Sequence, residues 1–303
     1  MSEQPTVMIP YPGPCLDREV QDIVLYLRPE TNGVRTESVM LKALREYPGS
    51  RDLYSLVYLA NLPGGFMASR RIVERRYALR ERFAREGAAA FTPTMKRQFE
   101  EHFGVGFEGA PVVGAYEALS RLGITEEGLF AVWVDERQFT RIHQQSIKLV
   151  RGLYVVNYDI PALLHRDSQK TDVFTMILRC FAPYAEIHAL IDRMCAALEA
   201  AGIISARRPP SRVFHASSGP FVQVLDGLCY VYSAAAEPVP AGDLSFGAWL
   251  ARRGVEGATL EGLLAEPIMR FRTAAGVVER HLFDHTIECS YAEAFRRLGD
   301  RVD

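Results

Sequence analysis

Apolar positions along the chain follow two patterns, and each pattern predicts a different element. Short, continuously apolar runs predict buried strands at residues 22–28, 52–60, 129–134, 153–160 and 170–181. Apolar residues spaced by three and four predict helices between Gly65 and Gly87 and at 36–47, 93–103, 116–122, 185–202, 244–252, 259–265 and 291–298. Strands and helices therefore interleave along most of the chain.

A different pattern surrounds the dipeptide Asp226-Gly227. Apolar and polar residues alternate over 221–233, and Asp-Gly is typical of the type I′ turn in a two-residue hairpin. The run 268–288 fits neither period, so the sequence does not decide whether this segment is a helix or a strand. Hairpins mixed with β–α units predict an α+β fold with mixed sheets and with helices packed on one face.

Two segments of the chain resemble each other in their order of elements. Asp22 opens an apolar run followed by a helix and Gly49, and Asp172 opens a second run followed by a helix and Gly202. This pattern is typical of ferredoxin-like β–α units. Duplication of one unit is one interpretation, and two independent units of common pattern is the other.

These boundaries predict three parts. We expect an N-terminal α+β domain over 1–165 and a second β–α–β–hairpin unit over 166–233. The remaining part, 234–303, would hold a linker, helices and a hairpin that pack on the second unit.

Composition narrows the class of protein. The chain has 303 residues with a formal net charge of −2, which argues against a nucleic-acid-binding surface spread over the whole molecule. No apolar run approaches the roughly 20 residues of a membrane span, and the N-terminus lacks the features of a signal peptide. Five dispersed cysteines without a C-x-x-C pair favour a reducing compartment. We therefore expect a cytoplasmic protein.

The loop Pro63-Gly64-Gly65 is the first candidate site. If strands 22–28 and 52–60 run parallel, their C-terminal ends share one sheet edge, where open α/β sheets bind ligands. That edge would bring Arg28 and Asn32 beside Gly64 and Gly65, at the amide end of a helix that favours anions. The alternative is that the glycines only permit a tight turn.

The arginine-rich helix that follows contributes two more candidates. Most of its arginines fall on a polar face that needs only water, whereas Arg76 and Arg80 project from the apolar face. An arginine in that position extends its charge to solvent, pairs with a buried carboxylate or binds a ligand anion. Pairing within the protein is the favoured interpretation, because buried charges are normally paired.

The clustered histidines near the C-terminus raise a metal hypothesis. His281, His285 and Cys289 are spaced by four, and only a helix would bring them within ligating distance. The alternation of the segment favours a strand. The sequence H-L-F-D-H is similar to the inverted zinc-peptidase motif H-x-x-E-H, but too few residues follow for the third ligand. The context therefore argues against a metal site.

No nucleophile–base pair or cofactor fingerprint stands out, so no catalytic residue and no cofactor is assigned. The leading hypothesis is a binding, scaffolding or regulatory protein with a protein partner or a second copy of itself. An enzyme that acts on a phosphorylated or carboxylated small molecule, held by Arg28, Arg76, Arg80 and the glycine loop, is the alternative. RNA binding across an exposed sheet face is the third hypothesis.

Overall fold

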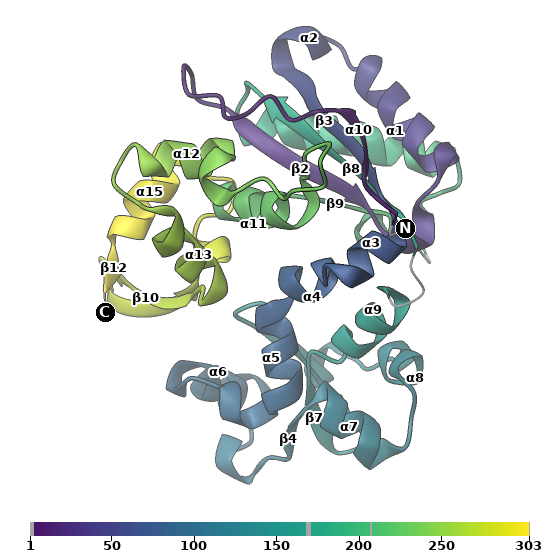
Figure 1. The fold of residues 1–303 in the computed structure, drawn as a ribbon. Coiled ribbons are helices and arrows are strands. Elements are labelled where there is room, and N and C mark those ends of the chain that lie inside the picture. Colours follow the sequence, from purple (N-terminus) through teal and green to yellow (C-terminus); the bar gives the residue numbers. More distant parts are fainter. Residues whose placement is uncertain (1–2, 168–170, 207, 303) are drawn as a thin grey trace.

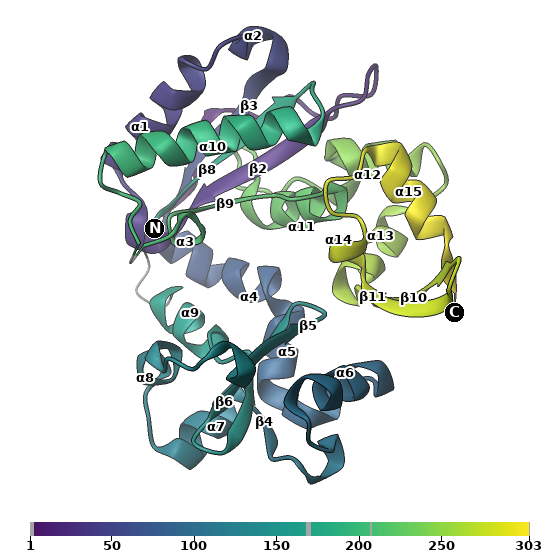
Figure 2. The same cartoon turned by 180° about the vertical axis from the view of Figure 1, so that it is seen from behind.

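The protein folds into three lobes, seen in a computed structural model that describes residues 3–167, 171–206 and 208–302 (Figure 1). The sheet lobe comprises residues 6–62 and 173–216, the insertion lobe 64–167 and the C-terminal lobe 220–302. The fold is α+β, as predicted, with helices and three separate sheets. In Figures 1 and 2, helices α4 and α11 lie where the three lobes meet.

The sheet lobe is built on five antiparallel strands in the order β1-β3-β8-β2-β9. Their bounds are Thr6–Ile9 for β1, Gln21–Leu27 for β2, Tyr54–Leu62 for β3, Val173–Cys180 for β8 and Phe214–Ala216 for β9. Helices α1 (Val34–Arg45) and α10 (Tyr184–Ala200) pack together on one face, and the short α2 spans Ser50–Leu53. The central strands β2 and β8 are buried along their whole length, which explains their continuously apolar sequences.

The two similar segments that begin at Asp22 and Asp172 form two parts of this single sheet. Strand β8 lies between β2 and β3 and is antiparallel to both, so β2 and β3 run parallel, as predicted, without being neighbours. The successive elements β2-α1-β3 and β8-α10-β9 follow a β–α–β–β–α–β order. The predicted boundary at 165/166 therefore separates strands that belong to one sheet.

The insertion lobe enters between β3 and β8 and carries a second sheet in the order β4-β7-β6-β5. The strands are β4 (Val112–Gly114), β5 (Phe139–Ile142), β6 (Gln145–Val150) and β7 (Leu153–Val156). The helices are α3 (Gly64–Ser69), α4 (Ile72–Arg76), α5 (Ala78–Glu86), α6 (Pro93–Phe103), α7 (Ala115–Leu122), α8 (Glu126–Ala131) and α9 (Ile160–Asp167).

Two predictions fail in this lobe. The expected arginine-rich helix is divided into α3, α4 and α5, with Arg71 in the left-handed region at φ 51° and Tyr77 outside helical geometry at φ −109°. Instead of the expected strand 129–134, the chain completes α8 at Ala131 and continues without regular structure. The N-cap of this helix, Thr125, accepts a hydrogen bond from the Gly128 amide, so the polar residues before the apolar run begin a helix.

The C-terminal lobe joins helices to a small sheet in the order β11-β10-β12. Its elements are α11 (Pro220–Tyr230), α12 (Ser245–Ala251), α13 (Gly257–Ala265), β10 (Ile268–Thr273), β11 (Gly276–His281), α14 (Leu282–His285), α15 (Tyr291–Gly299) and β12 (Arg301–Val302). The ambiguous run 268–288 is thus a hairpin followed by one helical turn.

The predicted hairpin at 221–233 is wrong, because this segment is helix α11. The helix is buried around nearly its whole circumference between the sheet and the C-terminal lobe, so no polar stripe marks its period. Gly227 does not turn the chain. It lets Leu244 approach, since a Cβ at Gly227 would lie 2.6 Å from the Leu244 Cδ1 atom.

Among the residues that the structure describes, none of the helices combines the length and apolar character needed to cross a membrane.

Candidate functional site

The glycine loop already binds a carboxylate of the protein itself. Pro63 precedes α3, and the Gly64 amide at the start of the helix donates to Asp172 Oδ1 at 3.0 Å. The second oxygen of Asp172 accepts from Asn61 Nδ2 at 2.9 Å. Gly65 follows in the same turn. The amide end of α3 is therefore occupied by an internal anion.

Arg28 and Asn32 lie at the same sheet edge, but each is also engaged within the protein. Arg28 Nη1 donates to the Tyr77 hydroxyl at 3.0 Å, and Arg28 Nε donates to the Ser211 carbonyl at 3.2 Å. Asn32 Oδ1 accepts from the Phe174 amide at 2.8 Å. These contacts fasten the end of β2 to its surroundings. Arg28, Asn32 and the Gly64 amide are therefore each engaged by other groups of the protein.

Arg76, at the end of α4, forms a buried ion pair with Asp226 of α11. Its side chain is 12% exposed and that of Asp226 is fully buried. Asp226 Oδ2 also accepts from Ser217 Oγ at 2.9 Å and lies 2.8 Å from His215 Nε2. Burial opposes ionisation of this carboxyl, but the charge of Arg76 and the hydrogen bonds outweigh it and lower the Asp226 pKa to about 2.

The residues Ser217, His215 and Asp226 are those of a hydrolase triad, but their order in space is different. Asp226 lies between the serine and the histidine, whereas a base must lie between the nucleophile and the carboxylate. Ser217 is buried, and its hydroxyl is engaged with the backbone of Val24. This cluster joins α4, α11 and β9, and its serine and its carboxylate are both buried.

Arg80, one turn into α5, also pairs within the protein. Its Nη2 atom donates to both carboxylate oxygens of Asp159, at 2.7 and 3.0 Å, and approaches Ser146 Oγ at 3.3 Å. The helical pattern therefore placed Arg76 and Arg80 correctly on an inner face, and each has an internal carboxylate. Both arginines nevertheless line a cavity.

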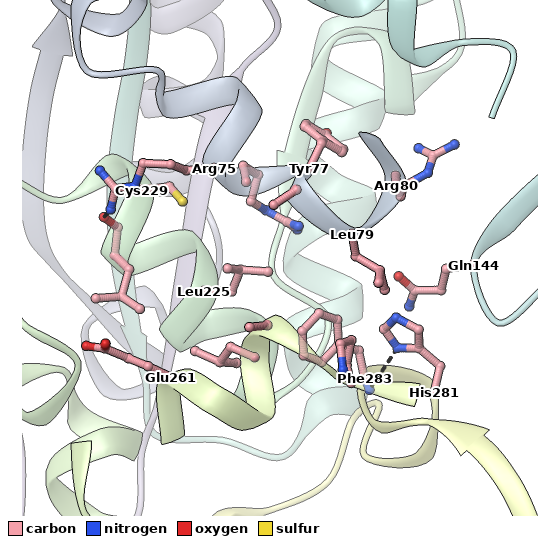
Figure 3. Close-up of a pocket in the computed structure, with 16 residues that line it drawn as sticks. Arg75, Tyr77, Leu79, Arg80, Gln144, Leu225, Cys229, Glu261, His281 and Phe283 are labelled. Carbon is pink, nitrogen blue, oxygen red and sulfur yellow. Dashed lines mark hydrogen bonds between the residues drawn. The ribbon is translucent and has the colours of Figure 1, made fainter. Parts of the chain in front are cut away.

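This first cavity, of about 370 Å³, lies between the α4–α5 junction, α11, α13 and the β11–α14 corner (Figure 3). Most of its lining is apolar: Ala78, Leu79, Leu225, Leu228, Leu264, Ala265, Pro267 and Phe283. Polar groups come from Arg75, Arg76, Gln144, Glu261 and His281. Figure 3 shows the guanidinium of Arg80 turned away from Leu225, toward the insertion lobe.

A second cavity, of about 340 Å³, adjoins the first and is strongly polar. It is lined by Arg80, Arg141, His143, Gln144 and Asp284. Arg80 and Gln144 belong to both linings, so the two cavities lie side by side in the hollow between the insertion lobe and the C-terminal lobe. We call this hollow the interlobe cleft.

Two arginines line the polar half of the cleft, and Asp159 neutralises one of them, Arg80. Arg141 is exposed, and no carboxylate lies within ion-pair distance of it in the part of the chain that the structure describes. Asp284 is the single acidic residue in this lining, and it accepts a hydrogen bond from Gln144 Nε2 at 2.7 Å. An anionic group placed here would meet Arg80 and Arg141 as donors.

The turn that carries two of these residues has unusual backbone geometry. His143 and Gln144 connect β5 to β6 with φ angles of 45° and 65°, values that hairpins normally assign to Asn-Gly. Each residue contacts the C-terminal lobe: His143 Nε2 lies 3.1 Å from Glu279 Oε1, and Gln144 bonds to Asp284. Left-handed backbone in ordinary residues costs about 1–2 kcal/mol each, and these contacts help to hold it.

The three residues of the metal hypothesis fall on different elements. His281 ends β11, His285 lies on α14 with its ring 4.2 Å from the ring of Phe271, and Cys289 follows α14. The predicted strand thus ends at His281. Within the described ranges, no three His, Cys, Asp or Glu side chains converge in a way that could hold a metal ion.

Comparisons with known proteins returned no match: no family model fits the chain, and neither a curated protein nor a solved structure was found to be similar to it.

Sequence analysis missed most of the cleft. Neither Arg141 nor His143 belongs to a recognisable motif, and the His143-Gln144 turn lacks the usual turn residues. The one available signal was the pair of short alternating runs on either side of that dipeptide. The Asp226-Gly227 pattern predicts a turn, whereas Asp226 lies in helix α11, so the sequence does not reveal that Asp226 pairs with Arg76.

Proposed function

We propose that the protein is a cytoplasmic binding protein for a small anionic molecule, which it holds in the interlobe cleft. One observation carries the proposal: an apolar cavity of about 370 Å³ adjoins a polar cavity of about 340 Å³ lined by Arg80 and Arg141. Small-molecule sites are typically concave, mostly apolar and furnished with a few convergent polar groups, within about 300–1,000 Å³. The five free cysteines support the cytoplasmic address.

Binding is favoured over covalent catalysis by the chemistry of the lining. Cys229 is the thiol of the first cavity, and burial raises its pKa to about 12, so it is a poor nucleophile at neutral pH. The polar cavity is lined by arginine, histidine, glutamine and aspartate side chains. The arginine, histidine and glutamine side chains can donate hydrogen bonds to an anion and orient it, while Asp284 accepts from Gln144.

The main sheet gives less support to RNA binding. Strands β2 and β8 are buried on both faces, under α1 and α10 on one side and against α11 on the other. Recognition of single-stranded RNA by a sheet requires exposed aromatic side chains on which bases stack. The hypothesis that the protein acts as a scaffold for other proteins stays a prediction.

Calorimetric titration with inorganic phosphate, ribose 5-phosphate and succinate tests the proposal. We expect at least one of them to bind, and Arg141→Ala to weaken that binding roughly tenfold, since a charge-assisted hydrogen bond contributes about 1.5–3 kcal/mol. Arg193→Ala removes the same charge from an exposed position on α10 and is the matched control. Lack of binding to the wild type, or equal binding by the two variants, would refute the proposal.

A further inference from the structure

His281 is a buried polar residue whose ring contributes to the apolar half of the cleft. It ends β11, is 2% exposed and lines the first cavity beside Gln144 and Leu79 (Figure 3). Its Nδ1 atom accepts a hydrogen bond from the Phe283 amide at 3.3 Å. In the part of the chain that the structure describes, the other ring nitrogen, Nε2, has no hydrogen-bond partner.

The contact with Phe283 decides which nitrogen of the neutral ring carries the proton. Because Nδ1 accepts from a backbone amide, the proton of the neutral imidazole must lie on Nε2. Burial lowers the pKa of His281 to about 3, and the charges of His143 and Arg76 act in the same direction. The ring is therefore an uncharged N–H donor throughout the physiological range of pH.

An uncharged donor favours a different ligand group from the one that the nearby arginines favour. A carboxylate or phosphate gains most from Arg80 and Arg141, whereas a buried neutral N–H is best satisfied by a carbonyl oxygen or a ring nitrogen. An aliphatic chain would leave Nε2 unpaired, which costs binding free energy. The apolar half thus fits a body that is largely apolar and carries one neutral acceptor.

The walls around His281 suit a flat ring. Phe283 follows two residues later at the same corner, and it lines the cavity together with Leu79, Leu225, Leu228 and Leu264. Aromatic rings pack against aromatic and aliphatic side chains of this kind. Nucleobases combine such a flat body with ring nitrogens and carbonyl oxygens that accept hydrogen bonds.

Building on the function proposed above, we propose that the ligand is a nucleoside monophosphate. Its base lies in the apolar cavity and accepts a hydrogen bond from His281 Nε2. Its phosphate lies in the polar cavity against Arg80 and Arg141. His281 is then the residue that distinguishes a nucleotide from other phosphates, and it acts through binding alone.

Titration of the whole chain with AMP, GMP, CMP, UMP, ribose 5-phosphate and octanoate tests this assignment. We expect at least one nucleotide to bind more tightly than ribose 5-phosphate, which lacks a base. His281→Asn keeps an acceptor near the Phe283 amide but loses the donor in the cleft, so we expect nucleotide affinity to fall about 3- to 10-fold. Ribose 5-phosphate should bind this variant and the wild type equally.

His281→Gln serves as the second variant, because its amide restores an N–H near the position of Nε2. Nucleotide affinity should recover at least in part, whereas a general loss of folding would weaken ribose 5-phosphate and nucleotides alike.

The inference is overturned if ribose 5-phosphate binds as tightly as every nucleotide, or if octanoate alone fills the cleft. It is also overturned if His281→Asn leaves nucleotide binding intact. In each of these cases an anion still binds, so the function proposed above survives. That function fails separately if no anion binds to the wild type, or if Arg141→Ala and Arg193→Ala bind the anion equally.

Discussion

The C-terminal lobe meets the rest of the molecule at two interfaces of very different construction. Against the sheet lobe it is fastened by a buried polar network around Asp22. Both carboxylate oxygens of Asp22 accept from Arg179, at 2.8 and 2.9 Å, and Oδ2 also accepts from Ser245 of α12 at 2.6 Å and from Tyr11 at 3.1 Å. Every member of the network thus has partners.

A second buried chain of hydrogen bonds crosses the same interface. Gln223 of α11 donates from Nε2 to Gln21 Oε1 at 2.7 Å and to the Tyr184 hydroxyl at 2.8 Å, and its Oε1 accepts from the Tyr291 hydroxyl at 3.3 Å. It connects β2, α10, α11 and α15. Fully satisfied buried networks make an interface rigid, because loss of any partner leaves a buried group unpaired.

Against the insertion lobe the contacts are mixed: the Arg76–Asp226 pair between α4 and α11 is buried, whereas two contacts beside the interlobe cleft are exposed. The pair Arg82–Glu266 has side chains 40% and 64% exposed, and the Gln144–Asp284 bond also lies at the surface. Exposed pairs contribute little because water competes for both partners. The difference indicates that the buried network and the Arg76–Asp226 pair hold the lobes together, while the exposed contacts beside the cleft can open to admit a ligand.

The largest expected effect is at the buried interface. Asp22→Ala leaves the Arg179 guanidinium buried without its carboxylate, so we expect the free energy of unfolding to fall by about 3–5 kcal/mol. Urea denaturation measures the loss. Asp192→Ala, on the exposed face of α10, should change stability by less than about 0.5 kcal/mol. A loss below about 1 kcal/mol for Asp22→Ala would show that this interface is no stronger than the other.

A smaller effect is expected at the junction of α4 and α11, from the titration of Asp226. Its pKa is lowered from 3.8 to about 2 in the folded protein, so the carboxylate contributes stability above pH 4 that is lost as the pH falls toward 2. The loss is on the order of 2 kcal/mol.

Urea denaturation of the wild type and Asp226→Asn, repeated between pH 6 and pH 2.5, measures this contribution. The difference between their unfolding free energies should shrink as the pH falls below 4. A difference that is constant over the whole series would contradict the assignment of the charge to this junction.

The smallest effect on stability is expected at the exposed interface. Arg82→Ala should change the free energy of unfolding by less than about 1 kcal/mol, because the pair with Glu266 is solvated. Amide hydrogen exchange should nevertheless become faster around β10 and the β5–β6 turn, since the lobes separate more often. Arg85→Ala removes an ion pair to Glu81 within α5 and is the control, with no change expected across the cleft. Equal exchange in both variants would argue against a separable interface.

The sequence predicted the parts of the fold that depend on local pattern. The helical spacing over 185–202 and 93–103 predicted α10 and α6, and the apolar runs predicted β2, β3 and β8. It also placed Arg76 and Arg80 on an inner face. The partners of these arginines were out of reach, because Asp226 and Asp159 lie 150 and 79 residues away along the chain.

The failures share a physical cause, which is tertiary context that overrides local pattern. Helix α11 is buried on almost every side, so its sequence lacks the polar stripe that reveals a helix, and Asp226-Gly227 imitates a turn. The β5–β6 turn adopts left-handed geometry without glycine or asparagine, beside contacts from His143 and Gln144 to another lobe.

By itself, then, the sequence determined the α+β class, most of the helices and the inner position of Arg76 and Arg80. These features follow from periodicity and capping, which act over a few residues. Only the tertiary structure decided what neutralises those arginines and where a cavity remains. A cleft is formed by side chains from elements far apart in the chain, and its shape depends on how whole lobes pack. Arg141, Gln144 and His281 become neighbours of one hollow only after three lobes have folded around α4 and α11.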